Sequence, residues 1–432
     1  MSTDTAVRAH HLISIALAAD IAEFLSRSGL NIITTLVARL AGILRNADQL
    51  SCLDIHCCAV FFGLDDSFTE ALTSLSGLRH LIVHDAEAGA FKMIHTLRSE
   101  LISLAIYCGG LAWDKPDSTE MDFIRLCAHM GALQKLHISC PYNNFVHSGF
   151  RYHHLRELII QVTKIEELPS PLILSQTFPC LEYFKIGVDD DDNFGEFEIE
   201  HFEDFREAMT AIQCQCSWDK LQTVIGDIVV LDVFSFRCPV RELELTTVFW
   251  HLVPTLQRLI AQTHPKILTL WISNCTSFFW YEHGMDEHHQ SLLPQPQVGR
   301  LDTVVLNMGL PWQWEAPMPT FVSKLAESLE NANISHIKID FLDPTEHPLH
   351  PNTSPVEDST YENIAKSVAA SCTDLCTIAM CFSLTAVERV DCYRRIWNIT
   401  RSSEGTQSMV EMSAVVHLEA LRSLKDVSTS GI

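Results

Sequence analysis

The densest run of potential metal ligands in the chain is acidic. Residues Asp189 to Asn193 read Asp-Asp-Asp-Asp-Asn, and the EF-hand template places calcium-ligating oxygens in this run and at Glu200. The template also needs a glycine where the sequence has Phe194, and a helix where the preceding apolar pattern is typical of a strand. We therefore interpret residues 189–200 as a solvated loop, and calcium binding is the alternative.

Histidine and acidic side chains also cluster further along the chain, in a segment that we expect to be a loop. The cluster consists of His283, Asp286, Glu287, His288 and His289. Its spacing is not the HExxH of a helix-borne zinc site, and neighbouring ligands that no helix holds seldom form a selective site. We predict a second solvated loop here, and no metal-binding residues in the chain.

Aromatic side chains gather in one region of the sequence. They are Trp271, Phe278, Phe279, Trp280 and Tyr281, followed by Trp312 and Trp314. Exposed aromatic residues are the side chains that binding hot spots use. The alternative is structural, because the same residues could cover the core beneath a long connection.

The sequence contains none of the short motifs that mark common catalytic or cofactor sites. GxSxG, GxxxxGK[ST], GxGxxG and the kinase set are all absent. We predict no catalytic residues, no cofactor and no enzymatic activity. An α/β enzyme with an unrecognised active site is the alternative, and it would need a deep pocket at the carboxyl ends of its strands.

Charge and apolar content limit the classes of partner. The chain carries 54 acidic and 30 basic residues, a formal net charge of -24, and no basic run richer than Arg394-Arg395. Proteins that bind phosphates need a cationic surface, so we expect neither nucleic acid nor membrane as a partner. Apolar residues make up 47% of the chain, which is enough for a continuous core.

The cysteines and the amino terminus bear on the cellular compartment. The chain has 15 cysteines without a CxxC pair, and we interpret them as buried reduced thiols that act as small apolar side chains. Leu12 to Ala19 is similar to the apolar part of a signal peptide, but Asp4 precedes it and the apolar pattern continues beyond it. We therefore expect a cytoplasmic or nuclear protein.

One short apolar pattern recurs along almost the whole chain and predicts the elements that position these side chains. Each copy has three apolar residues: two residues of any type separate the first from the second, and one residue of any type separates the second from the third. Eleven full copies are Leu50-Leu53-Ile55, Leu78-Leu81-Val83, Leu101-Leu104-Ile106, Leu133-Leu136-Ile138, Leu155-Leu158-Ile160, Leu181-Phe184-Ile186, Val240-Leu243-Leu245, Ile267-Leu270-Ile272, Leu301-Val304-Leu306, Ile334-Ile337-Ile339 and Leu375-Ile378-Met380, and Leu221-Val224 is a degenerate twelfth. The second and third apolar residues lie two apart, so they face the same side of a strand.

Apolar stripes at helical spacing follow several of these triplets. They begin at Phe202, Leu252, Phe321 and Ile364. A short strand that alternates with a helix implies βα units and a parallel sheet. Because the triplets are 19 to 41 residues apart, the repeat is irregular compared with the usual leucine-rich repeat of about 20–29 residues.

The fold class that we predict is α/β, an irregular leucine-rich-repeat solenoid with a curved parallel sheet on one face and helices on the other. The alternative is a doubly wound α/β domain, whose strands are buried on both faces. Polar residues between the triplet positions favour burial of one face only. By register alone, we expect the partner-binding candidates on the exposed sheet face to be His84, His137, Gln161, Lys185, Glu244, Trp271 and Lys338.

The pattern also predicts three segments. Residues 1–49 contain two amphipathic stretches, about Leu12–Ser26 and Asn31–Arg45, and we expect a helical N-terminal cap. Residues 50–400 form the solenoid. Residues 401–432 form a polar C-terminal segment with a short helix at Met412–Leu424.

The triplets also carry a family resemblance. The stretches LRELIIQV, LEYFKIGV and VRELELTTV, irregularly spaced in a cysteine-rich acidic chain, resemble the repeat half of F-box/leucine-rich-repeat proteins, especially the divergent sets of mushroom-forming fungi. The resemblance covers about residues 43–400. It implies the substrate-binding part of a cullin-type ubiquitin ligase receptor.

The chain departs from that family upstream of the repeats. Residues 1–49 contain no proline, so the Leu-Pro-x-Glu-like start of an F-box is missing. A Skp1-like adaptor is therefore expected as a partner only if an F-box is present. The function that we predict is a protein–protein interaction scaffold whose target is another protein.

Overall fold

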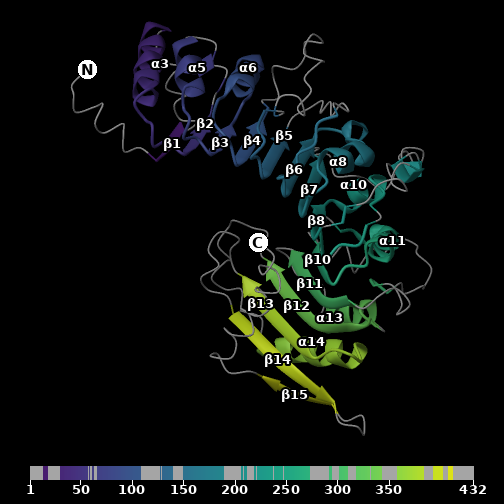
Figure 1. The fold of residues 1–432 in the computed structure, drawn as a ribbon. Coiled ribbons are helices and arrows are strands. Elements are labelled where there is room, and N and C mark those ends of the chain that lie inside the picture. Colours follow the sequence, from purple (N-terminus) through teal and green to yellow (C-terminus); the bar gives the residue numbers. More distant parts are fainter. Residues whose placement is uncertain are drawn as a thin grey trace. The chain divides into compact units, whose positions relative to one another are not determined.

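In the computed structural model, the described part of the chain has fifteen strands. Helices lie between many of these strands (Figure 1). The structure describes residues 13–17, 30–56, 58, 61–62, 66–108, 127, 129–139, 149–188, 206–207, 209–211, 218–219, 221–236, 238–246, 248–272, 291–293, 301–309, 318–330, 332–342, 358–383, 393–401 and 407–411. The chain divides into two compact units. The N-terminal unit comprises Met1–Leu221 with Val233–Ser235, and the C-terminal unit comprises Gln222–Asp232 with Phe236–Ile432.

The N-terminal unit contains seven of the described strands, and each pairs in parallel with the next one in the sequence. They are β1 (Ser14–Leu17), β2 (Cys52–Ile55), β3 (His80–Val83), β4 (Ser103–Tyr107), β5 (Lys135–Ser139), β6 (Glu157–Val162) and β7 (Tyr183–Val188). A doubly wound sheet reverses its strand order at one point, and these strands follow chain order throughout.

The C-terminal unit contains the other eight described strands. They are β8 (Thr223–Gly226), β9 (Glu242–Leu245), β10 (Ile267–Ile272), β11 (Leu301–Gly309), β12 (Ile334–Leu342), β13 (Thr377–Ser383), β14 (Tyr393–Arg401) and β15 (Gln407–Glu411). Strands β8 to β13 are parallel and follow chain order. Strands β14 and β15 are antiparallel additions to β13.

The helices lie between consecutive strands. They are α3 (Leu30–Leu44), α5 (Asp66–Thr73), α6 (Ala88–Thr96), η2 (Ile165–Glu167), α8 (Pro171–Thr177), α10 (Ile228–Val233), η4 (Trp250–Leu252), α11 (Val253–Thr263), α13 (Met318–Ser328) and α14 (Asp358–Ser371). In Figure 1, α3, α5 and α6 stand along one side of the N-terminal strands, and α3 contacts α5 as α5 contacts α6. Helix α5 buries Phe68, Ala71 and Leu72, which are three and four residues apart and so share one face.

The twelve predicted triplets supply the strands β2 to β13, one triplet to each strand. Every apolar residue of these triplets is buried, with at most 7% of its surface exposed. Most strands alternate between buried and half-buried residues, as β4 and β6 do. The prediction of an irregular leucine-rich-repeat solenoid is therefore confirmed, as are the helices at Leu252, Phe321 and Ile364.

Two segments differ from the sequence-based expectation. Ser14–Leu17, predicted as part of a helix at Leu12–Ser26, is strand β1, so that prediction is wrong at these four residues. A short apolar run fits either element, and here pairing with β2 determines the outcome. Gln407–Glu411, in the segment predicted to be polar with a short helix, is strand β15, whereas the predicted helix Met412–Leu424 lies outside the described residues.

The described cysteines mostly fit the interpretation of apolar thiols. Cys58, Cys127, Cys238 and Cys372 are buried, and burial raises the pKa of Cys127 to about 12 and that of Cys372 to about 11. Cys108 is disulfide-bonded. The expectation that all cysteines are reduced is therefore wrong at this position.

The side chain of Arg401, at the end of β14, caps helix α14. Its guanidinium donates to the carbonyl oxygens of Ala369, Cys372 and Leu375 at 2.7–2.8 Å. The last carbonyls of a helix have no partner within the helix, and a cation at that end also complements the helix dipole. Arg401 therefore links the antiparallel end of the sheet to the last helix of the solenoid.

We expect Arg401→Met to lower the free energy of unfolding by about 1–3 kcal/mol, because three charge-assisted hydrogen bonds are lost. Urea unfolding followed by circular dichroism measures the change. The matched control is Lys366→Met on α14, which breaks an exposed pair with Glu362 and should leave the free energy of unfolding nearly unchanged, because exposed ion pairs contribute little. Equal losses in the two variants would contradict the capping role.

Candidate functional site

The strands β2 to β7 of the N-terminal unit have one side on which residues are half-buried or exposed, and we call this side the open face. Across it, the parallel register aligns side chains of consecutive strands. The row in the middle of the strands contains Asp54, Ile82, Ala105, His137, Ile159 and Lys185. The row at their carboxyl ends contains Tyr107, Ser139, Gln161 and Gly187, and His56 and His84 extend it toward β2 and β3.

The backbone keeps these two histidines in line with the strands. His56 follows β2 directly, and its N–H donates to Leu17 O at 3.0 Å; His84 follows β3, and its N–H donates to Ile55 O at 2.8 Å. The next residue, Asp85, has a φ of 52° in the left-handed region, where Asp is tolerated better than most residues. The chain therefore turns away immediately after His84 and leaves its ring on the open face.

Four rings from four neighbouring strands contact each other in sequence, and we call them the ring cluster: His56, His84, Tyr107 and His137. His56 and His84 are stacked with ring centroids 3.8 Å apart and an interplanar angle of 10°. His84 stacks on Tyr107 at 4.6 Å and 5°. Tyr107 meets His137 edge-on at 4.7 Å and 71°. Since each ring limits the rotation of the next, the cluster is preorganised.

A hydrogen bond joins the last two rings of the cluster. It connects Tyr107 Oη and His137 Nδ1 over 3.0 Å, and the tautomer of the histidine decides which atom donates. The other ring nitrogen, His137 Nε2, is shielded from solvent and has no hydrogen-bond partner among the described residues. Buried polar atoms are nearly always paired, so this nitrogen is an unsatisfied polar atom beneath the open face.

Burial and neighbouring charges favour the neutral forms of His84, Tyr107 and His137. Burial lowers the pKa of His84, and His56 lowers it further, whereas the carboxylate of Asp54 acts in the opposite direction. Burial and then the charge of Lys185 lower the pKa of His137. Burial and the charge of Asp54 raise the pKa of Tyr107. At neutral pH His84, Tyr107 and His137 are therefore neutral hydrogen-bonding groups.

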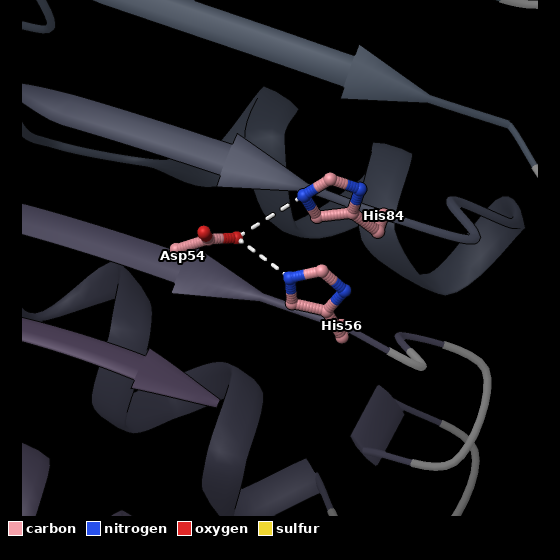
Figure 2. Close-up of side chains that lie close together, drawn as sticks. All are labelled: Asp54, His56 and His84. Atoms are coloured by element: carbon pink, nitrogen blue, oxygen red, sulfur yellow. Dashed lines mark ion pairs between the residues drawn. The ribbon is translucent and has the colours of Figure 1, made fainter. Parts of the chain in front are cut away.

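Asp54 lies beside two rings of the cluster (Figure 2). Its Oδ1 is 3.5 Å from His56 Nε2 and 3.3 Å from His84 Nε2. The ligand atoms of these three residues lie within 4.8 Å of one another, and in the part of the chain that the structure describes no other group of three acids, histidines or cysteines is close enough to hold a metal ion. The prediction that the chain has no metal-binding residues did not anticipate this arrangement.

Four of the seven predicted partner-binding residues lie on the open face of the N-terminal unit. His84 and His137 both contact Tyr107 and belong to the ring cluster. Gln161 on β6 is paired in register with Ser139, and Lys185 on β7 with Ile159. The register therefore places these two residues beside the cluster, on the same face.

The other three predicted residues lie in the C-terminal unit. Trp271 on β10 donates from Nε1 to Oε1 of Glu244 on β9 at 2.9 Å. Lys338 on β12 forms an ion pair with Asp340, two residues along the same strand. The seven residues are thus divided between two units, and their part in binding stays a prediction.

Asp54, His56 and Tyr107 are absent from the sequence-based candidates. A signal for two of them was present, because His56, His84 and Tyr107 each follow the last apolar residue of a triplet directly. Alignment of the triplets on that position would have placed the three rings in one row. The other clusters considered from the sequence, residues 189–200 and 283–289 and the aromatic residues beyond Trp271, lie outside the described residues.

Comparison with known proteins finds similarity among solved structures. No family model and no curated protein matches the chain. Among solved structures, the chain is similar to the leucine-rich-repeat-containing protein LegL7 from Legionella pneumophila, with 12% sequence identity, a TM-score of 0.37, and coverage of 70% of this chain and 94% of that chain. The fold assignment given above rests on strand order and burial in this chain itself.

Among the described residues, no helix has the length and apolar character needed to cross a membrane.

Proposed function

We propose that this chain is a cytoplasmic or nuclear protein-interaction scaffold, and that the open face of its N-terminal unit binds a segment of another protein. The observation that carries the proposal is the ring cluster on the open face. Stacking and one hydrogen bond hold these rings before any partner arrives. Preorganised aromatic groups lose little entropy on binding and are frequent at binding hot spots.

The composition of the surrounding face supports the same proposal. Ile82 and Ala105 lie in register between Asp54 and His137, so a small apolar area separates two polar groups. Lys135 and Glu157 form an ion pair over 2.7 Å at the amino-terminal side of the face. An apolar centre with a polar rim is the usual anatomy of a protein interface.

Capture of partners from cells that natively make the chain tests this proposal. The full chain serves as bait beside two variants, Tyr107→Ala in the ring cluster and Lys92→Ala on the exposed side of α6. We expect to capture a partner that binds the Lys92→Ala variant as well as the wild type. The affinity of the Tyr107→Ala variant for this partner should be lower by about tenfold or more, and tenfold corresponds to about 1.4 kcal/mol. Circular dichroism establishes that both variants are folded.

The binding of the partner should also be measured with purified proteins. Equal affinities of the wild-type chain and Tyr107→Ala would overturn the assignment of the open face. If His137→Ala abolishes partner binding and Tyr107→Ala does not, the site is restricted to His137 and the strands beside it.

We further propose that the scaffold acts as the substrate-binding part of an F-box-type ubiquitin ligase receptor. The support is the resemblance of the repeats at residues 155–162, 181–188 and 240–248 to that family. The same capture experiment tests it, because a Skp1-like adaptor and a cullin should then be recovered with the bait. Recovery of the partner without the adaptor would support the scaffold proposal and would reject the ligase role.

A further inference from the structure

The parallel register of β2 and β3 brings one carboxylate and two imidazoles together at the edge of the open face. Asp54 and His56 are two residues apart on an extended chain, so their side chains face the same side. Ile55 pairs with Val83, which places the residues that follow, His56 and His84, next to each other. The three groups come from segments 28 residues apart in the sequence, and their meeting is a property of the fold.

The spacing of the ligand atoms matches a metal coordination shell. In a tetrahedral site with metal–nitrogen and metal–oxygen distances of about 2.0–2.2 Å, adjacent ligand atoms are about 3.3–3.6 Å apart. The observed separations of Asp54 Oδ1 from the Nε2 atoms of His84 and His56 are 3.3 and 3.5 Å. Figure 2 shows both Nε2 atoms directed toward this oxygen.

The carboxylate oxygen between the two rings lacks a satisfactory partner within the protein. Asp54 Oδ1 is shielded from solvent, and its ion pairs with His84 and His56, at 3.3 and 3.5 Å, are long for hydrogen bonds to a carboxylate. A buried oxygen with only long contacts is incompletely satisfied, and an ion or ordered water at the same place removes that cost. A cation bound by all three atoms would satisfy Oδ1 and both ring nitrogens together.

Ring contacts also restrict the rotation of the two imidazoles. The stack of His56 on His84 and of His84 on Tyr107 restricts both rings. Groups around a metal site that fix ligand orientation raise its affinity.

We propose that Asp54, His56 and His84 bind a divalent transition-metal ion of the zinc class. Two nitrogens and one oxygen suit zinc, iron, cobalt or nickel, whereas calcium and magnesium prefer oxygen ligands throughout. Three protein ligands leave a fourth coordination position open, as in zinc sites that accept a water or an incoming ligand. The site shares His56 and His84 with the ring cluster, but metal binding by the chain alone does not require the proposed protein partner.

Zinc titration of the full reduced chain against a competing chromophoric chelator tests the proposal. The variants His84→Phe and His56→Phe keep a ring at each position and remove the ligand atom, and Asp54→Asn removes the carboxylate. We expect each variant to bind one equivalent of zinc fewer than the wild type, or to bind it with a much lower affinity. The loss of affinity should exceed the factor of about 10–100 that removal of a supporting group causes. His80→Phe is the matched control, because His80 lies exposed on the same face of β3 outside the cluster, and it should bind as the wild type does.

Cobalt provides a second readout, because its visible absorption reports low-coordinate nitrogen and oxygen ligation. We expect the wild-type chain and His80→Phe to show this absorption without a sulfur charge-transfer band, and His84→Phe to lose it. Equal zinc stoichiometry and affinity in the wild type and the double variant His56→Phe/His84→Phe would overturn the proposal. If His84→Phe fails to fold by circular dichroism, Asp54→Asn and His56→Phe decide the question in the same way.

Discussion

Phe184→Ala is expected to lower the free energy of unfolding of the N-terminal unit by about 3–5 kcal/mol. Phe184 is the middle apolar residue of its triplet and is fully buried on β7. Its ring contacts Trp218 at 6.2 Å and Phe234 at 5.7 Å between centroids. Truncation to alanine removes the ring from these neighbours and leaves a cavity that the surrounding repeats cannot fill without moving.

The effect should be specific to the buried position. Phe150→Ala is the matched control, because the side chain of Phe150 is 44% exposed, and a surface change of this kind usually costs within about 0.5 kcal/mol. Urea unfolding monitored by tryptophan fluorescence and circular dichroism compares the two. A loss below about 1 kcal/mol for Phe184→Ala would show that β7 does not bury its triplet as described, since the expected loss is a large part of a typical domain's stability.

Arg258→Leu is expected to lower the free energy of unfolding of the C-terminal unit by about 2–4 kcal/mol. Arg258 on α11 donates from Nε and Nη2 to the two carboxylate oxygens of Asp232 on α10, at 2.8 and 2.6 Å. The Asp232 side chain is only 8% exposed, whereas Arg258 is 38% exposed. The variant therefore removes two charge-assisted hydrogen bonds from a buried carboxylate. Most of the lost stability comes from leaving the charged Asp232 buried without its partner.

A double-mutant cycle separates this penalty from lost packing. Asp232→Leu combined with Arg258→Leu should recover part of the loss, because replacing both members of a buried ion pair with apolar residues is often nearly neutral. Chemical unfolding of the four proteins gives the coupling free energy. A double variant as unstable as the sum of the single variants would mean that the two side chains stabilise the unit independently.

The strands were predictable from the sequence because each one has to bury the same two positions. Leu53 and Ile55 in β2 illustrate this rule, and their spacing of two residues is visible without any structure. Strand β1 lacks such a triplet, and its four residues became a strand only because β2 offered an edge for parallel pairing. The antiparallel strands β14 and β15 were not predicted from the sequence either, because they are defined by pairing with β13 and with each other.

The candidate site was predictable only in part. His84 and His137 were identified because alternation along a strand indicates which residues face outward. The contact of His84 with His56 and Asp54 depends on which residue of β2 lies beside which residue of β3, and a connection of more than 20 residues separates the two strands. Sequence periodicity does not determine that register, because loop length and helix packing decide it.

The sequence by itself therefore determined the kind of molecule: a stack of one-sided parallel strands with helices between them. It did so because burial of apolar side chains acts locally and repeats at a fixed spacing. Only the tertiary structure decided where chemistry is concentrated. The ring cluster and the Asp54–His56–His84 group exist because backbone pairing across strands aligns side chains that are far apart in the chain, and that alignment is a long-range property of the fold.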